Sequence, residues 1–147
     1  MLDKPLTRDD LCKFFSVKER GLGRVLRDLG IPLRGGTTRW SVVWGALGLA
    51  GEQDPAHHAE LTTPLLTARG VAELVGVAGP SIVYRWEKGA VPAGAPPFPA
   101  SLDISAGRKG ARPKRWRRAE VLAWHTGQEL PRYARAAPVF GALTPTK

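Results

Sequence analysis

The strongest constraint on the fold is an internal repeat. Residues 6–47 and 66–125 show the same order of features: a threonine, an apolar stripe at helical spacing, a break, a second stripe, a proline, a basic segment, an Arg-Trp pair and a short helix. The paired positions 60 residues apart are Leu6/Leu66, Thr7/Thr67, Leu11/Val71, Phe14/Leu74, Val17/Val77, Leu22/Ile82 and Pro32/Pro92, and Arg39-Trp40 matches Arg115-Trp116 at an offset of 76. A repeat of this length predicts two similar structural units, with an insertion in the second.

Local signals place the helices of each unit. Thr7 and Thr67 are natural N-caps, because a threonine hydroxyl can accept a hydrogen bond from an unpaired amide of the first turn. Ser16 and Gly76 end the first helices, and Gly30 and Gly89 follow the second ones. We expect first helices at residues 8–15 and 68–74, second helices at 19–29 and 80–88, and third helices at 42–47 and 119–125.

The segments between the second and third helices are expected to form hairpins. Gly35-Gly36 lies between short arms and predicts a tight turn. In the second unit, residues 101–104 and 113–116 are candidates for paired strands. The predicted fold is therefore mainly α with small β-hairpin wings, as two tandem winged helix-turn-helix domains.

The domain boundaries follow from composition. The predicted domains are residues 1–49 and 64–129. Residues 50–63, rich in Gly, Asp, Pro, His, Glu and Thr, are expected to be a flexible linker. Residues 130–147 contain three prolines and a few basic groups, and are expected to be a basic, loosely ordered tail or an arm that orders on contact.

The charge balance points to a polyanionic partner. Twenty-two Lys and Arg oppose thirteen Asp and Glu, which gives a formal net charge of +9 at pH 7. A basic protein of this size attracts nucleic acid through long-range electrostatics. A single cysteine, Cys12, fits a reducing compartment, residues 1–10 do not resemble a secretory signal, and no apolar run is long enough to span a membrane. We expect a cytoplasmic protein encoded by a bacterium, phage or mobile element.

The second helices and the wings carry the candidate DNA contacts. An exposed helix of a helix-turn-helix unit fits the major groove, and wing cations reach phosphates or a minor groove. Inward positions are expected at Leu22, Val25, Leu26 and Leu29, and at Ile82, Val83 and Trp86. The candidate recognition residues are Lys18, Arg20, Arg24, Arg27, Ser81, Tyr84, Arg85 and Lys88, and the wing residues are Arg34, Arg39, Arg108, Lys109, Arg112 and Lys114. From Arg108 to Arg118 there are seven Lys or Arg and no acidic residue.

Other chemistries find little support in the sequence. His57-His58 lacks further ligands at metal spacing, so no metal site is expected. No phosphate-binding glycine loop or Ser/His/Asp arrangement occurs, so we expect neither a cofactor nor enzymatic activity. The five tryptophans, Trp40, Trp44, Trp86, Trp116 and Trp124, are assigned to equivalent core positions rather than to base stacking.

The second unit resembles a known family. The stretch from Leu65 to Val77 (LLTARGVAELVGV), followed by Ser81 to Trp86 (SIVYRW) and by Arg115 to Trp124 (RWRRAEVLAW), is similar to the AlpA/excisionase-type, MerR-like winged helix proteins. The first unit resembles them only through Leu6-Thr7, Val17 and Arg39-Trp40. The resemblance implies a DNA-binding protein of phages or mobile elements that either bends attachment-site DNA for an integrase or regulates transcription.

These observations predict sequence-specific binding of double-stranded DNA. The leading hypothesis is an excisionase, or recombination directionality factor, that bends DNA for an integrase. The alternative is a transcriptional regulator of the same fold that acts with RNA polymerase. A phage terminase recognition domain and a protein-interaction module without DNA binding are further hypotheses. The expected partners are double-stranded DNA, an integrase or RNA polymerase, and further copies of the chain bound cooperatively on DNA, with no membrane.

Overall fold

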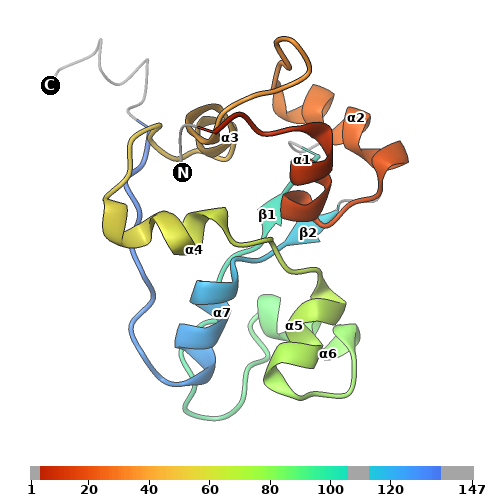
Figure 1. Ribbon diagram of the computed structural model, residues 1–147. Helices are drawn as coiled ribbons and strands as arrows, with labels where there is room; N and C mark the ends of the chain where they lie inside the picture. Colours follow the sequence, from red (N-terminus) through yellow and green to blue (C-terminus); the bar gives the residue numbers. More distant parts are fainter. Residues whose placement is uncertain (1–3, 106–112, 137–147) are drawn as a thin grey trace, which may run out of the picture.

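The computed structural model describes residues 4–105 and 113–136. Its described part is mainly helical, with seven α-helices and one two-stranded antiparallel hairpin (Figure 1). The elements are α1 (Arg8–Phe15), α2 (Glu19–Leu29), α3 (Trp40–Ala46), the 3-10 helix η1 (Pro55–His57), α4 (His58–Thr62), α5 (Ala68–Val75), α6 (Pro80–Glu87), β1 (Leu102–Asp103), β2 (Lys114–Arg115) and α7 (Arg118–His125). In the hairpin, Leu102 pairs with Arg115 and Asp103 with Lys114.

The predicted caps begin and end the first helix of each unit. The Thr7 hydroxyl accepts from the Asp10 amide at 3.2 Å, and the Asp10 carboxylate accepts from the Thr7 amide at 2.9 Å, which completes a capping box. The Thr67 hydroxyl accepts from the Gly70 amide at 3.0 Å. Ser16 and Gly76 both take the left-handed conformation that ends a helix, with φ of 56° and 80°. The repeat offset of 60 therefore holds through both first helices.

The last third of the repeat has a different register from the one predicted. Leu6 and Thr38 exchange two backbone hydrogen bonds, and so do Leu66 and Trp116. The third helices begin two residues after each pair, at Trp40 and at Arg118. The structural offset is thus 78, and matching Arg39-Trp40 with Arg115-Trp116 at 76 was wrong. The five tryptophans are consequently not at equivalent positions, and Trp40 is only half-buried.

Two main cores support the two sets of helices. Helices α1–α3 lie above the β1–β2 hairpin in Figure 1, and α5–α7 lie below it. The first core contains Leu11, Phe14, Phe15, Leu22, Val25, Leu26, Ile31 and Val43, and the second contains Val71, Val83, Trp86, Phe98, Trp116, Val121 and Trp124. The first core also contains Leu65 and Ile104, which come from beyond the predicted linker. The first core therefore includes residues from both predicted domains.

The segment expected to be a flexible linker is folded. It contains η1 and α4, and Leu61 on α4 packs with Trp44 and Leu49 in a third apolar cluster. The Trp44 indole N–H donates to the Leu61 carbonyl at 3.1 Å. Composition suggested a linker because α4 has only five residues and lacks a long apolar stripe. Its stability comes from these tertiary contacts rather than from local propensity.

The first part of the predicted tail is also held in place. The Ala50 amide donates to the Ala134 carbonyl at 2.9 Å, and the Ala136 amide donates to the Gly48 carbonyl at 3.2 Å. The buried Gln53 side chain donates to Ala134 at 2.7 Å and accepts from its amide at 3.0 Å. The expectation of a loosely ordered tail is wrong for residues 130–136, while residues 137–147 lie outside the described part. Among the described helices, none is long and apolar enough to cross a membrane.

Candidate nucleic-acid interface

Helix α2 has two opposite faces. Leu22, Val25 and Leu26 are buried and Leu29 packs against the same core, as the sequence predicted. Arg20, Arg24 and Arg27 are all exposed. At 3.6 residues per turn, these three arginines cluster within one arc on the side of the helix opposite the buried stripe. The helix therefore presents three guanidinium groups together, with Lys18 at its N-cap.

The acidic residues of α2 do not neutralise that face. Glu19 accepts from Arg8 on α1 at 2.7 Å. Asp28 lies 3.9 Å from Arg24, but its side chain is only 10% exposed whereas that of Arg24 is 62% exposed. Among the described residues, Lys18, Arg20 and Arg27 form no ion pair. The outer face of α2 thus remains cationic.

A tight hairpin follows α2 in the chain, as predicted. Arg34 and Thr37 exchange backbone hydrogen bonds of 2.8 and 3.2 Å across Gly35 and Gly36. Both glycines have positive φ, 63° and 82°, which this two-residue turn requires. Glycine at both positions therefore fixes the hairpin.

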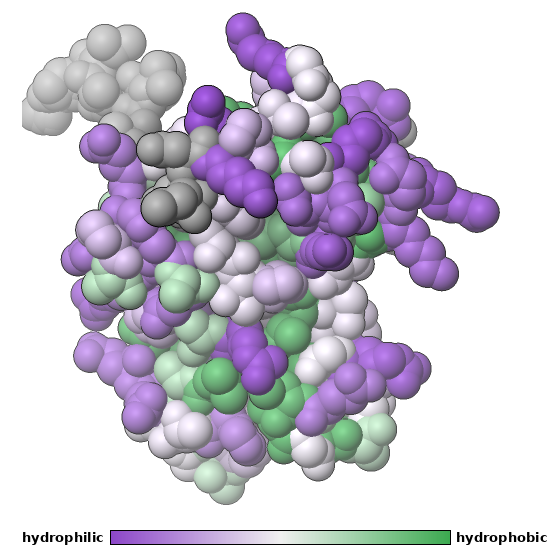
Figure 2. Space-filling model, viewed as in Figure 1, coloured by the Kyte–Doolittle hydropathy of each residue, from purple (hydrophilic) through white to green (hydrophobic). Residues whose placement is uncertain are grey.

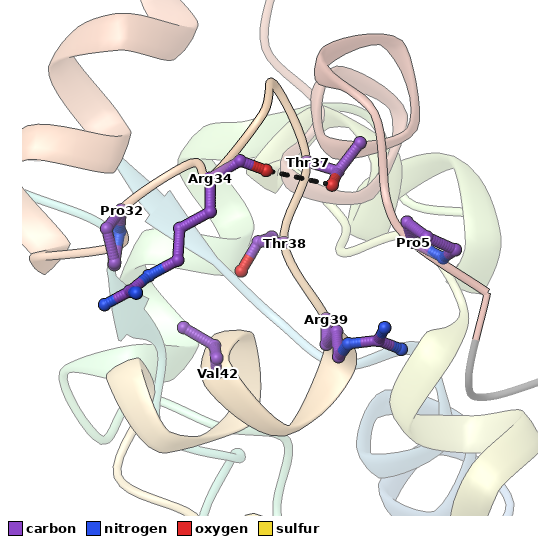
Figure 3. Close-up of a pocket in the computed structure, with 7 residues that line it drawn as sticks. All are labelled: Pro5, Pro32, Arg34, Thr37, Thr38, Arg39 and Val42. Atoms are coloured by element: carbon purple, nitrogen blue, oxygen red, sulfur yellow. Dashed lines mark hydrogen bonds between the residues drawn. The ribbon is translucent and has the colours of Figure 1, made fainter.

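The hairpin and α3 enclose a shallow basic pocket (Figure 3). It has a volume of about 270 Å³ and is lined by Pro5, Pro32, Arg34, Thr37, Thr38, Arg39 and Val42. Arg34 runs beside Val42, and Arg39 projects on the other side of the pocket, toward Pro5. Both arginines are exposed, so this region places two cations beside the pocket.

Helix α6 is oriented as the sequence predicted. Ser81, Tyr84, Arg85 and Lys88 are exposed, whereas Val83 and Trp86 are buried and Ile82 is half-buried. Tyr84 is one of the two large hydrophobic residues that stand exposed among the described residues, the other being Val42. The α6 surface thus combines an aromatic ring with two cations.

Lys114 differs from its expected role as a wing cation. Its ammonium group donates to the Glu87 carboxylate at 2.8 Å and lies 6.0 Å from the centre of the Tyr84 ring. Burial raises the pKa of Glu87, but the hydrogen bonds from Lys114 and Ser101 outweigh it, and the net pKa is below 4.5. Lys114 therefore ties β2 to α6. The other wing candidates, Arg108, Lys109 and Arg112, lie outside the described residues.

Two further arginines of the basic run serve the fold, which sequence reasoning missed. Arg115 donates to the Phe15 carbonyl at 2.8 Å and to the Ser16 carbonyl at 3.1 Å, both at the C-terminal end of α1. Arg117 is buried. The sequence signal available was that both flank the buried Trp116.

Hydrophilic side chains gather over one part of the face seen in Figure 2. Figure 2, viewed as in Figure 1, shows long hydrophilic side chains over α1 and α2, at the upper right. More hydrophobic surface appears around α5–α7, in the lower half. Comparisons of the chain with protein-family models, with curated proteins and with solved structures found no match.

Proposed function

We propose that the chain binds double-stranded DNA, with α2 as the main contact and α6 as a second one. The observation that carries the proposal is the arrangement of α2, whose three exposed arginines lie opposite its buried stripe. A major groove about 12 Å wide accepts one helix with its side chains. Arginines on the outer side of such a helix can donate to guanine or to phosphates.

A solvated surface is the simpler alternative for exposed arginines. Three features favour a polyanion instead. Residues 18–39 contain six Lys or Arg and only two acidic residues, and both acids are turned toward partners in the protein. The glycine hairpin that follows α2 in the chain carries a further exposed cation, Arg34. Like charges repel, so stability alone does not favour their concentration in one place.

The architecture we propose is two winged helix-turn-helix units, residues 1–49 and 64–129, that bind DNA together as one rigid body. The shared core residues Leu65 and Ile104 and the two bonds from Arg115 to α1 support a fixed relation between α2 and α6. This differs from two units on a flexible tether. A duplex contacted by both helices would have to match their spacing, either as B-DNA or by bending.

The biological role we propose is that of a recombination directionality factor, with a transcriptional regulator as the alternative. This proposal rests on the resemblance of residues 65–77, 81–86 and 115–124 to the AlpA/excisionase-type proteins. In the first role the partner is an integrase, and in the second it is RNA polymerase. Deletion of the gene followed by an assay of prophage or element excision separates the two roles.

The test of DNA binding begins with sequencing of genomic fragments retained by the purified protein. Fluorescence anisotropy on a selected duplex then compares the wild type with Arg20→Ala and Arg27→Ala over a range of salt concentrations. Each lost phosphate contact should lower the slope of log affinity against log salt by about 0.9, and a lost base contact should weaken binding about tenfold or more. Arg118→Ala is the matched control, an exposed arginine on α7. Equal affinities for all three variants and the wild type would refute the proposal.

A further inference from the structure

A second basic cavity lies away from α2. It has a volume of about 330 Å³ and is lined by Leu49, Arg117, Glu120, Pro131, Arg132, Tyr133 and Arg135. Most of its lining residues come from the N-terminal end of α7 and from residues 130–136. Figure 1 shows this segment on the left of the molecule, whereas α2 and α6 lie on the right. The cavity is therefore separate from the proposed duplex surface.

Arg117 is the unusual residue of this cavity. It is 9% exposed, yet its guanidinium donates no hydrogen bond to any described residue. The closest carboxylate oxygen, on Glu120, is 3.9 Å away, beyond hydrogen-bonding distance. The Tyr133 ring lies 5.5 Å from the guanidinium carbon. No buried side-chain nitrogen among the described residues lacks a partner, so the Arg117 N–H groups that make no hydrogen bond reach solvent and can donate to a ligand in the cavity.

The surrounding groups leave the cavity positively charged. Three arginines line it against one carboxylate, that of Glu120. The Tyr133 hydroxyl donates to Glu60 at 3.0 Å, and burial together with this bond raises the pKa of Tyr133, so the ring stays neutral. Burial lowers the pKa of Arg117 and nearby Arg135 adds to the effect, but an arginine stays protonated at neutral pH.

We propose that this cavity binds a phosphate-class oxyanion, with Arg117 as the buried donor and Arg135 at the rim. An oxyanion in the cavity would accept hydrogen bonds from Arg117 in place of water and would relieve the repulsion between Arg117 and Arg135. The amide groups at the start of α7, whose N-cap is Arg117, add a favourable dipole. The volume is enough for a phosphate that carries a substituent. The proposal goes beyond duplex binding by α2 and does not depend on it.

Thermal unfolding in inorganic phosphate tests the proposal. The wild type is compared in phosphate at millimolar concentration and in chloride at equal ionic strength, and calorimetric titration gives the phosphate Kd. We expect saturable stabilisation, lost in Arg117→Gln and weakened about tenfold or more in Arg135→Gln. Arg118→Gln removes the same charge from an exposed position of α7 and should bind phosphate like the wild type.

The rim variant keeps the test decisive if Arg117→Gln fails to fold. The proposal is overturned if phosphate gives no saturable effect, or if Arg135→Gln and Arg118→Gln titrate alike. Anisotropy with a duplex then identifies the source of the phosphate. Loss of duplex affinity and a smaller salt slope in Arg135→Gln would assign the site to a nucleic-acid phosphate. Unchanged duplex affinity, with phosphate still bound, would assign it to a free anion or a small phosphorylated ligand, and both results support the site.

Discussion

Removing the Arg115 guanidinium should destabilise the protein by about 2 to 3 kcal/mol. Arg115→Met keeps most of the side-chain volume but deletes the bonds to the Phe15 and Ser16 carbonyls. Hydrogen bonds to charged groups contribute about 1.5 to 3 kcal/mol each. Arg115 is only half-buried, so water can reach part of the exposed carbonyls, and we expect each bond to contribute at or just below the low end of that range, about 1 to 1.5 kcal/mol. A shift of this size lowers the Tm by roughly 5 to 10 °C for a chain of this length.

Urea unfolding followed by tryptophan fluorescence measures the change, because Trp44 and Trp116 report on the first and second halves of the chain. Arg115→Lys keeps the charge but lacks the planar fork that donates to two carbonyls. Its free energy of unfolding should therefore lie between those of the wild type and Arg115→Met. Arg118→Met is the control, with an expected change below about 0.5 kcal/mol. If Arg115→Met were as stable as Arg118→Met, the prediction would be refuted, and the contact between the two halves of the chain would not depend on these two bonds.

Three further changes have expected outcomes. Gly23→Ala should stabilise the protein by about 0.5 to 1 kcal/mol in urea unfolding, because Gly23 is an exposed residue inside α2 and an added Cβ meets nothing within 4 Å; a destabilised variant would contradict this. Thr67→Ala should cost about 1 kcal/mol through loss of the α5 cap, measured by the same unfolding, and an unchanged stability would contradict the role of this cap. The pKa of Glu87 is lowered in the fold, so its contribution is present above pH 4.5 and lost as the pH falls through the lowered pKa; Glu87→Gln should therefore show less loss of stability on acidification than the wild type, and equal acid dependence would refute the role of the Lys114 pair.

Local signals determined what the sequence could predict. Thr7, Thr67, Ser16 and Gly76 begin or end helices through interactions with their own neighbours in the chain, so their roles can be read without the fold. The Gly35-Gly36 hairpin follows for the same reason, since its backbone requires positive φ. The inward and outward sides of α2 follow from its 3.6-residue period.

What the sequence did not show depends on contacts between distant residues. The Arg-Trp dipeptide occurs in both halves of the chain, and its two copies suggested an offset of 76. In the structure Thr38 is instead equivalent to Trp116, because each pairs with the leucine that precedes a threonine N-cap. Helix α4 and segment 130–136 depend on Trp44 and Gln53, which lie far from them in the chain. A run of basic residues does not reveal which arginines face the protein, so Arg115 and Arg117 could not be distinguished from exposed members such as Arg118.

The joined units make one further prediction about the spacing of DNA half-sites. If α2 and α6 contact one duplex from a rigid body, inserting about five base pairs between their contacts turns the second contact by roughly half a helical turn. The affinity should then fall to that of a single unit, because the protein cannot follow the rotation. A flexible tether would instead tolerate the insertion with a modest loss. Anisotropy on duplexes of graded spacing distinguishes these outcomes. Because Arg115 links β2 to the end of α1, Arg115→Met should widen the range of half-site spacings that the protein tolerates. An unchanged range would mean that the shared core around Leu65 and Ile104 keeps the two helices fixed.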